Sequence, residues 1–298
     1  MGTPAENLAP KLAEVLPSLE RTRRLGLLLG GTLFLLGLAL GFWGARWLWR
    51  EGELLLAFFA LILGAGLGLL GYFAALSPFT LGFKRQVVGA LAKALGLEYR
   101  PEDYLPQDEF QASFLFHQTT DYTGEDLFTG PGIVFSEIRA EQVWGGGRRR
   151  ESLPVFKGLF LRAEGPWDEE VYLVPGAPHP ELVQRLGPPP YRIRANLLAQ
   201  EGPWQVYGTG EHPPVWLPQV AEVLRRRFPQ NPPYVAFHPG RLYVALPAED
   251  RFEPNEFRRL DLPSLPALLE TLGKDLQDLL ACVNELRSLA KGRRLSNT

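Results

Sequence analysis

Residues 25–45 read LGLLLGGTLFLLGLALGFWGA and residues 54–76 read LLLAFFALILGAGLGLLGYFAAL, and neither run contains a charged side chain. At about 1.5 Å per helical residue the runs would reach roughly 31 and 34 Å, and the hydrocarbon core of a bilayer is about 30 Å thick. A short connector with Arg46, Arg50, Glu51 and Glu53 joins them. The pattern predicts a transmembrane helical hairpin over residues 25–81.

A cleaved signal peptide is the alternative interpretation of the first run. The apolar core of a signal peptide has about 7–15 residues and is followed by a small-residue cleavage site. Here the run has 21 residues, is followed by Trp47 and Trp49, and a second run comes directly after it. The hairpin is therefore favoured, and residues 1–24 form a short segment before it.

Basic residues near the ends of the runs indicate which side of the membrane each end occupies. The connector has two basic residues, and each outer flank has more, namely Lys11, Arg21, Arg23 and Arg24 before the hairpin and Lys84, Arg85 and Lys93 after it. The distribution predicts an inner (plasma) membrane protein with two helices and both termini in the cytoplasm. Trp43, Trp47 and Trp49 then suit the far membrane interface.

Small residues recur at a spacing of four along both runs. The rows are Gly26 and Gly30, Gly37 and Gly41, and Ala60, Gly64 and Gly68. Such rows let helix backbones approach closely in lipid. Two interpretations are open: the hairpin packs on itself, or these faces mediate self-association or docking to another membrane protein.

The remainder of the chain, residues 84–298, has the composition of a soluble domain. Of 31 basic and 33 acidic side chains, six and five lie in residues 1–83, which leaves 25 and 28 and a formal charge of −3. This balance gives no electrostatic basis for binding nucleic acid. The single cysteine, Cys282, excludes an intramolecular disulfide. Abundant arginine and proline fit a thermophilic source or, equally, a GC-rich genome.

The hydrophobic pattern of residues 84–298 predicts an α+β domain in which helices flank a mostly antiparallel sheet. The second transmembrane helix should end at Ser77-Pro78, because the residue before proline disfavours the helical region. Helices are expected over residues 84–97, 216–228 and 264–291, and a loop over 99–109. Strands are expected over residues 113–117, 133–138, 155–161, 171–174, 191–198, 204–207, 234–237 and 242–246.

The sequence contains no recognisable catalytic motif. It has no nucleophile elbow, phosphate-binding loop or metalloprotease helix. The histidines have no metal-ligand spacing and are expected to be solvated loop residues, namely His117, His179, His212 and His238. We therefore expect no catalytic residue, cofactor or metal.

The densest polar cluster is residues 121–126, which includes Glu125 and Asp126. It lacks the ligand spacing and the closing glutamate of a calcium loop. Asp and Gly here favour a turn before the next strand, and a cation or partner site is the alternative.

Two further groups of polar residues are candidates for interaction. Ser136 and Glu137 follow Phe135 in a predicted strand, and alternation places Glu137 on the same face as Phe135. Lys157 on the neighbouring strand is a candidate partner for Glu137, and a structural ion pair is favoured over a catalytic one. Arg148, Arg149 and Arg150 occupy the expected tip of this hairpin, where they form a solvated rim or contact anionic lipid or an acidic partner.

Four short motifs resemble those of an uncharacterised bacterial family that has two N-terminal membrane helices and a C-terminal domain of unknown function. The resemblance covers roughly residues 98–286. Its motifs are Gly124-Glu125-Asp126, Phe135-Ser136-Glu137, Phe156-Lys157-Gly158-Leu159-Phe160 and Val206-Tyr207-Gly208. Residues 162–167 depart from the family pattern. The resemblance implies a membrane-anchored protein and no particular reaction.

The favoured functional interpretation is a membrane-anchored interaction or scaffold module in the cytoplasm. The alternative is a membrane-proximal, hydrolase-like enzyme, with Asp126, Glu137 and His117 as its acid–base residues. Transport is disfavoured, because neither helix carries a charge within the membrane.

Overall fold

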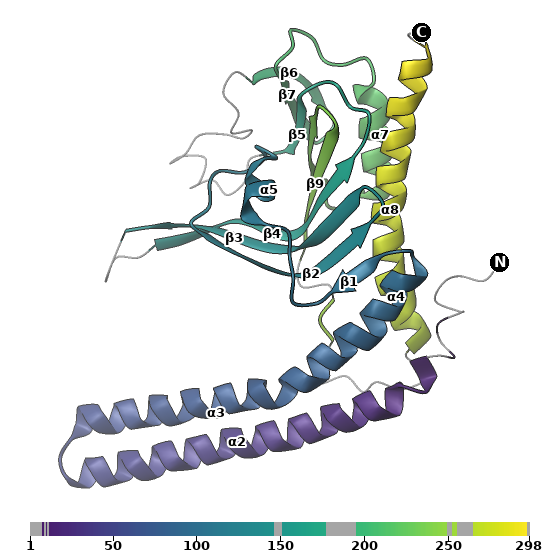
Figure 1. Ribbon diagram of the computed structural model, residues 1–298. Helices are drawn as coiled ribbons and strands as arrows, with labels where there is room; N and C mark the ends of the chain where they lie inside the picture. The colour runs from purple at the N-terminus through teal and green to yellow at the C-terminus, as the bar shows by residue number, and fades with distance from the viewer. Residues whose placement is uncertain are drawn as a thin grey trace. The chain divides into compact units, whose positions relative to one another are not determined.

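The computed structural model describes residues 8, 10, 12–145, 151–176, 195–248, 252–254 and 265–296, with side chains in the last range described for 267–274 and 276–290. The chain divides into two compact units, and each is described by itself: residues 1–91 with 252–271, and residues 92–251 with 272–298. Two long N-terminal helices precede a nine-stranded antiparallel sheet with flanking helices (Figure 1). The predicted α+β class is confirmed.

The first unit is built on a helical hairpin. Helix α2 runs over Leu16–Arg50 and helix α3 over Leu54–Phe83, and the two lie side by side (Figure 1). Only residues 51–53 form the turn, where Gly52 has the positive φ of 82° that glycine tolerates. Both helices are longer than the runs 25–45 and 54–76. At the end of α2, charged residues such as Arg46 continue the helix instead of forming a loop.

Glycines from both helices meet where the backbones are closest. A Cβ atom on Gly37 would lie 2.5 Å from the carbonyl oxygen of Gly64, and one on Gly41 would lie 3.0 Å from that of Ala60. At 2.5 Å only glycine fits without a shift of the backbone, and 3.0 Å is tight for a Cβ atom. The small-residue rows therefore face one another inside the hairpin, and self-association through them would require the hairpin to open.

The outward surfaces of the hairpin are apolar. Large side chains are exposed on both helices, for example Leu28 at 70%, Trp43 at 70% and Leu55 at 69% of their surface. In the most apolar 18-residue window of each helix only a small share of the residues is buried, 17% in the first helix and 11% in the second. Both helices are long and apolar enough to cross a membrane.

The second helix does not end at Ser77-Pro78, contrary to the prediction. Helix α3 includes Pro78 and continues to Phe83. Proline removes one helical hydrogen bond and costs about 3 kcal/mol in a helix interior. The flanking residues Leu76 and Phe79 are 1% and 0% exposed, so packing on both sides of the proline offsets that loss.

Beyond α3 the chain stays helical through a π-helical turn, η1 (Lys84–Val88), and α4 (Gly89–Ala94). The helix predicted over residues 84–97 is thus present as far as Ala94, but it continues α3 instead of forming a separate helix. Gly96 closes it with a φ of 74°, and the N–H of Leu97 donates to the carbonyl oxygen of Ala92 at 2.9 Å. This is the expected glycine C-cap.

The second unit contains a single sheet in the order β1-β2-β3-β4-β9-β8-β5-β7-β6, in which every neighbouring pair is antiparallel. Its strands are β1 Glu98–Arg100, β2 Asp121–Gly130, β3 Ile133–Trp144, β4 Glu151–Glu164, β5 Val171–Pro175, β6 Asn196–Glu201, β7 Trp204–Gly208, β8 Tyr234–His238 and β9 Arg241–Pro247.

Helix α5 (Gln107–Gln111) lies over one face of the sheet, where an aromatic core forms. The ring of Phe110 is fully buried, stacks on Phe116 at 5.1 Å between centroids and meets Phe160 at 4.9 Å. Phe160 and Tyr243 come from the adjacent strands β4 and β9. This packing holds the α5 segment on the sheet.

Helices α7 (Leu217–Arg227) and α8 (Leu265–Ser296) belong to the other face (Figure 1). Trp216, at the start of α7, packs edge-on against Phe237 of β8 at 4.7 Å. Arg287 of α8 donates to the carbonyl oxygens of Gly132 and Glu164, and thereby ties the helix to the β2–β3 turn and the end of β4.

Most predicted elements of the domain are confirmed. The two hairpins (β3–β4 and β8–β9), strands β5 and β7, and helices α7 and α8 lie where the sequence predicts them. The strand predicted over residues 191–198 is described only from residue 195 and is β6 from residue 196. The predicted loop over 99–109 contains the end of β1 and the start of α5.

Two predictions for the domain are wrong. Residues 113–117 are not a strand: they follow α5, and Phe114 there has a φ of 54°. Residues 121–126 are not a turn but the first half of β2. The short strand β1 pairs only with the second half of β2, so these polar residues have a ladder partner on one side alone. A sheet edge tolerates polar residues that an interior strand would not.

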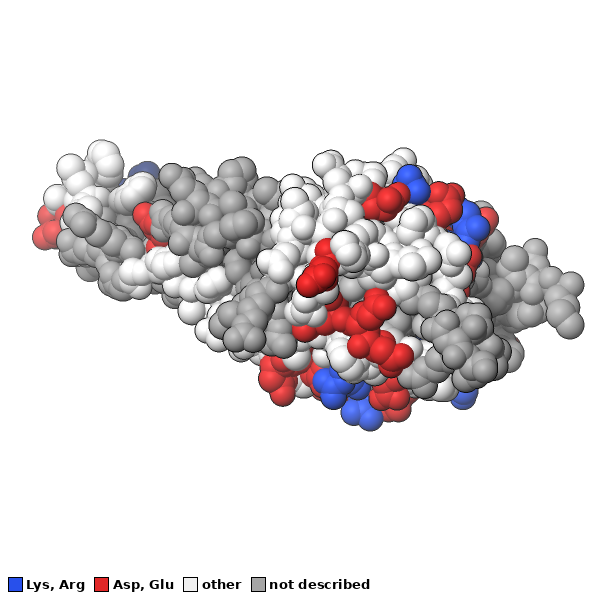
Figure 2. Space-filling model, turned by 90° about the horizontal axis from the view of Figure 1, so that it is seen from above, with Lys and Arg blue, Asp and Glu red and all other residues white. Residues whose placement is uncertain are grey.

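Charge on the molecular surface is unevenly distributed. Figure 2 shows a face on which Asp and Glu side chains gather, whereas Lys and Arg lie toward its edges.

Candidate functional site

Three of the four motifs noted in the sequence come together on neighbouring strands. Residues 124–126 lie on β2, residues 135–137 on β3 and residues 156–160 on β4. The register places Glu125 opposite Glu137, and Glu137 opposite Leu159. The fourth motif, residues 206–208, is on β7, between β5 and β6, and does not join this group.

A β-bulge interrupts β2 at this point. The register shifts between Glu125 and Phe128, and Asp126 has the left-handed φ of 60°. The backbone N–H of Asp126 donates to the carbonyl oxygen of Pro101 at 3.1 Å instead of to a strand partner. A bulge redirects side chains from strict alternation, which allows two successive acidic residues to point the same way.

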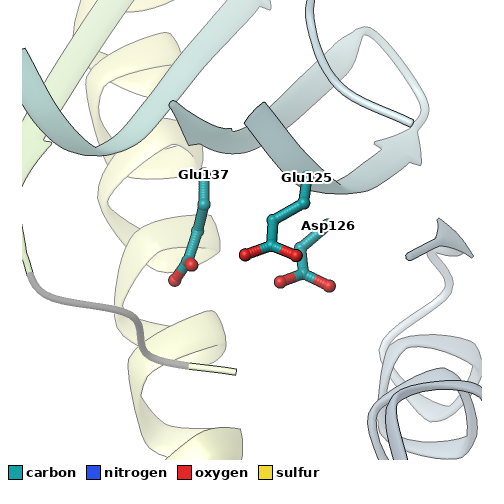
Figure 3. A group of neighbouring side chains, drawn as sticks. All are labelled: Glu125, Asp126 and Glu137. Atoms are coloured by element: carbon teal, nitrogen blue, oxygen red, sulfur yellow. The ribbon is translucent and has the colours of Figure 1, made fainter. Parts of the chain in front are cut away.

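The carboxylates of Glu125, Asp126 and Glu137 lie close together (Figure 3). One oxygen from each lies within 4.8 Å of the others. Asp126 is fully buried, Glu137 is 7% exposed, and Glu125 is half-buried. The hydroxyl of Tyr99 donates to Oδ1 of Asp126 and orients that carboxylate.

This arrangement suits a hard divalent cation. Oxygen ligands bind Ca²⁺ at about 2.3–2.6 Å, so two oxygens on one ion lie no more than about 5 Å apart. Like charges at this spacing repel in a buried site, and a divalent cation would relieve that repulsion. Glu125, Asp126 and Glu137 are the residues that could hold such an ion.

Two other sequence candidates, Ser136 and Lys157, lie beside this group. Oγ of Ser136 accepts from the backbone N–H of Leu105 at 3.0 Å inside the protein, so it secures the segment before α5. Lys157 faces Arg139 in the register, and Glu137 faces Leu159. Glu137 and Lys157 are thus diagonal neighbours across the hairpin, and the ion pair between them stays a prediction.

Two other sets of candidates do not join the acidic group. His117 lies after α5, with Nδ1 3.0 Å from the carbonyl oxygen of Gln118. Within the described ranges, the only cluster of three or more His, Cys, Asp or Glu residues with ligand atoms this close is the three carboxylates, without a histidine. Arg148, Arg149 and Arg150 lie outside the described residues.

A second polar cluster, which the sequence analysis did not find, surrounds His238 at the end of β8. Its Nε2 lies 3.2 Å from the carbonyl oxygen of Ser113, and its Nδ1 lies 3.7 Å from Oε1 of Glu170. The hydroxyl of Tyr172 donates to the same glutamate at 2.7 Å. His238 is therefore a partly buried link between β8, β5 and the residues after α5, not a solvated loop residue.

Alternation along β8 could have indicated this position. Ala236 and His238 share one face of the strand, and Ala236 belongs to the aromatic core. The ring of Tyr243 lies 5.4 Å from that of His238, and burial raises the pKa of this tyrosine. Two acceptors near the imidazole nitrogens and three aromatic neighbours hold the ring in place.

The single thiol does not belong to either cluster. Cys282 lies on α8 and is 1% exposed. Burial raises the pKa of this thiol to about 12, so it stays protonated near neutral pH. A protonated, buried thiol is not a nucleophile.

Comparison of the chain with protein-family models, with curated proteins and with solved structures finds no match.

Proposed function

We propose that this protein is anchored in a membrane by α2 and α3, with both termini in the cytoplasm, and that the sheet domain acts there as an interaction or scaffold module. The observation that carries the proposal is the contrast between the two surfaces of the hairpin. Glycines such as Gly37 and Gly64 lie inside it, and large apolar side chains cover its outside.

This contrast favours lipid over water as the surroundings of the hairpin. A core helix of a soluble protein would bury most of its apolar residues, whereas the two windows here are only 17% and 11% buried. Soluble proteins rarely expose apolar patches of more than a few hundred Å². In lipid, close backbone packing at small residues takes the place of the hydrophobic drive between helices.

The orientation rests on charge. The connector region has Arg46 and Arg50, and both outer flanks carry more basic residues. In the flank before the hairpin, Arg23 and Arg24 both pair with Glu20 at 2.8 Å. Positive residues are retained on the cytoplasmic side, so the turn at residues 51–53 would lie outside.

The proposed topology predicts opposite reporter activities at two sites. A fluorescent protein fused after Thr298 should fluoresce, and alkaline phosphatase inserted at Gly52 should be active, because the first site is cytoplasmic and the second is not. Bacterial expression of both fusions, with reporters exchanged as the control, provides the measurement. Phosphatase activity at the C-terminus without fluorescence would contradict the orientation.

A second candidate function rests on the acidic group in Figure 3. We propose as the alternative a membrane-proximal, hydrolase-like site in which Asp126 and Glu137, with Glu125, act through a bound divalent cation. The supporting observation is the convergence of three carboxylates, two of them buried, at the β-bulge where Asp126 has a left-handed φ. Such a cation would polarise a substrate oxygen or lower the pKa of a bound water.

The two candidates predict different responses to cations. If the acidic group binds Ca²⁺, Mg²⁺ or Mn²⁺, saturating cation should stabilise the folded domain by about 2.7 kcal/mol at one hundred times the Kd. The apparent Tm of the detergent-solubilised chain should then rise by several degrees relative to EDTA, and Glu137→Gln should abolish the rise. Glu222→Gln, on the exposed side of α7, is the matched control and should keep it. An unchanged Tm in wild-type protein would exclude the cation site, and the interaction or scaffold module would be the remaining candidate.

A further inference from the structure

A groove of about 440 Å³ lies between α2 and α3 at the end of the hairpin nearest the turn. Its size is within the range of pockets that hold small ligands. Most of its walls are apolar, and residues of both helices line it: Phe42, Ala45, Trp49, Leu54, Phe58 and Leu61. An apolar groove in this position is shaped for a hydrocarbon chain.

Two guanidinium groups also line this groove. Arg46 and Arg50 are one helical turn apart on α2, so they lie on the same side of the helix. Both are exposed, and among the described residues neither has a carboxylate within the 4.0 Å of an ion pair. Guanidinium groups match phosphate oxygens in a bidentate geometry. The groove thus combines an apolar wall with two cations.

We propose that the groove binds one phospholipid with an anionic headgroup, its acyl chain along the apolar wall and its phosphate at Arg46 and Arg50. This inference rests on the proposed function, because it requires the hairpin to span a bilayer. The turn then lies at the membrane–water interface, where Trp43, Trp47 and Trp49 are exposed by 57–70% in the manner of an aromatic belt.

Selectivity for such a lipid must come from its headgroup. Within a bilayer every lipid tail is as apolar as the helix surface, so the acyl chain contributes little preference. Two cations attract a headgroup with net negative charge more strongly than a zwitterionic one, in which a quaternary ammonium offsets the phosphate. Phosphatidylglycerol should therefore be favoured over phosphatidylcholine with the same acyl chains.

Native mass spectrometry of the full chain, purified in mild detergent, tests the proposal. With equal amounts of the two lipids, wild-type protein should retain phosphatidylglycerol about ten-fold more than phosphatidylcholine, which corresponds to about 1.4 kcal/mol. Arg46→Gln with Arg50→Gln should remove this preference. Arg21→Gln is the matched control, because Arg21 is an exposed arginine of α2 at the opposite end of the span, outside the groove.

Three outcomes would overturn the inference. The first is equal retention of both lipids by wild-type protein, and the second is an equal loss of the lipid preference in Arg21→Gln. The third is a dimer whose mass persists with no lipid bound, which would mean that a second copy covers the groove. Carbonate extraction of membranes tests separately whether the hairpin spans the membrane. A chain released by carbonate would contradict the membrane proposal itself, whereas a retained chain without lipid preference would contradict only the lipid site.

Discussion

Replacing Gly158 with alanine is expected to destabilise the sheet domain by about 2–6 kcal/mol, the sum of about 1–3 kcal/mol for backbone strain and about 1–3 kcal/mol for overpacking. Gly158 has a φ of 150°, and an added Cβ would lie 2.2 Å from the carbonyl oxygen of Leu246 and 2.7 Å from the backbone nitrogen of Ala248. Both contacts are to backbone of or next to β9, so no side chain can move aside.

Domain stabilities are typically about 5–15 kcal/mol, so a loss of this size would raise the population of the unfolded domain and with it the rate of proteolysis. Limited proteolysis of the purified chain, with the unfolding midpoint in denaturant, measures the effect. Gly240→Ala is the matched control: this glycine also has a positive φ, of 78°, but no atom lies within 4 Å of an added Cβ. Gly240→Ala should be destabilised only by backbone strain, by about 1–3 kcal/mol. Equal losses in the two variants would show that the close contact at Gly158 is unimportant.

Replacing Gly37 with alanine is expected to weaken the hairpin by about 1–3 kcal/mol, the usual cost of overpacking. The new methyl group would lie 2.5 Å from the carbonyl oxygen of Gly64 and 2.6 Å from the Cα of Gly68. These are backbone atoms of the partner helix, so α2 and α3 would have to separate. Small residues at helix contacts in lipid are required for this reason.

Unfolding of the detergent-solubilised chain by increasing amounts of SDS, followed by circular dichroism, measures the loss. Gly31→Ala is the matched control, because Gly31 is on the same helix and has no atom within 4 Å of an added Cβ. It should be neutral or slightly stabilising, since alanine favours a helix by about 1 kcal/mol over glycine. If Gly37→Ala behaves like Gly31→Ala, the close glycine contact does not hold the hairpin together.

The contrast between Gly37 and Gly31 shows how far the sequence could predict this hairpin. Length and absence of charge identify both helices, and the spacing of four identifies which glycines form the contact. The ends were less predictable. Arg46 and Arg50 resemble a connector in hydropathy but complete α2, and Pro78 resembles a stop signal but lies within α3 between buried residues. Packing overrides local preference at Pro78, whereas the two exposed arginines are themselves good helix formers.

The acidic group was only partly predictable. Glu125, Asp126 and Glu137 could each be noted in the sequence, but residues 121–126 have the composition of a turn. Strand β2 and its bulge depend on the register with β3, which composition does not encode, although Glu125 and Glu137 are only 12 residues apart. His238 and Glu170 are 68 residues apart and meet only because β8 and β5 are neighbours in the sheet.

Two uncharged runs that form a helical hairpin, asymmetric charges around it and an α+β domain after it could all be predicted, because these properties depend on local periodicity and composition. Which residues come together became clear only in the folded chain: the three carboxylates at the bulge of β2, the imidazole of His238 beside Glu170, and the groove with Arg46 and Arg50. Each of these depends on how separate elements pair, and the free energy of that pairing comes from packing and register rather than from any single stretch of chain.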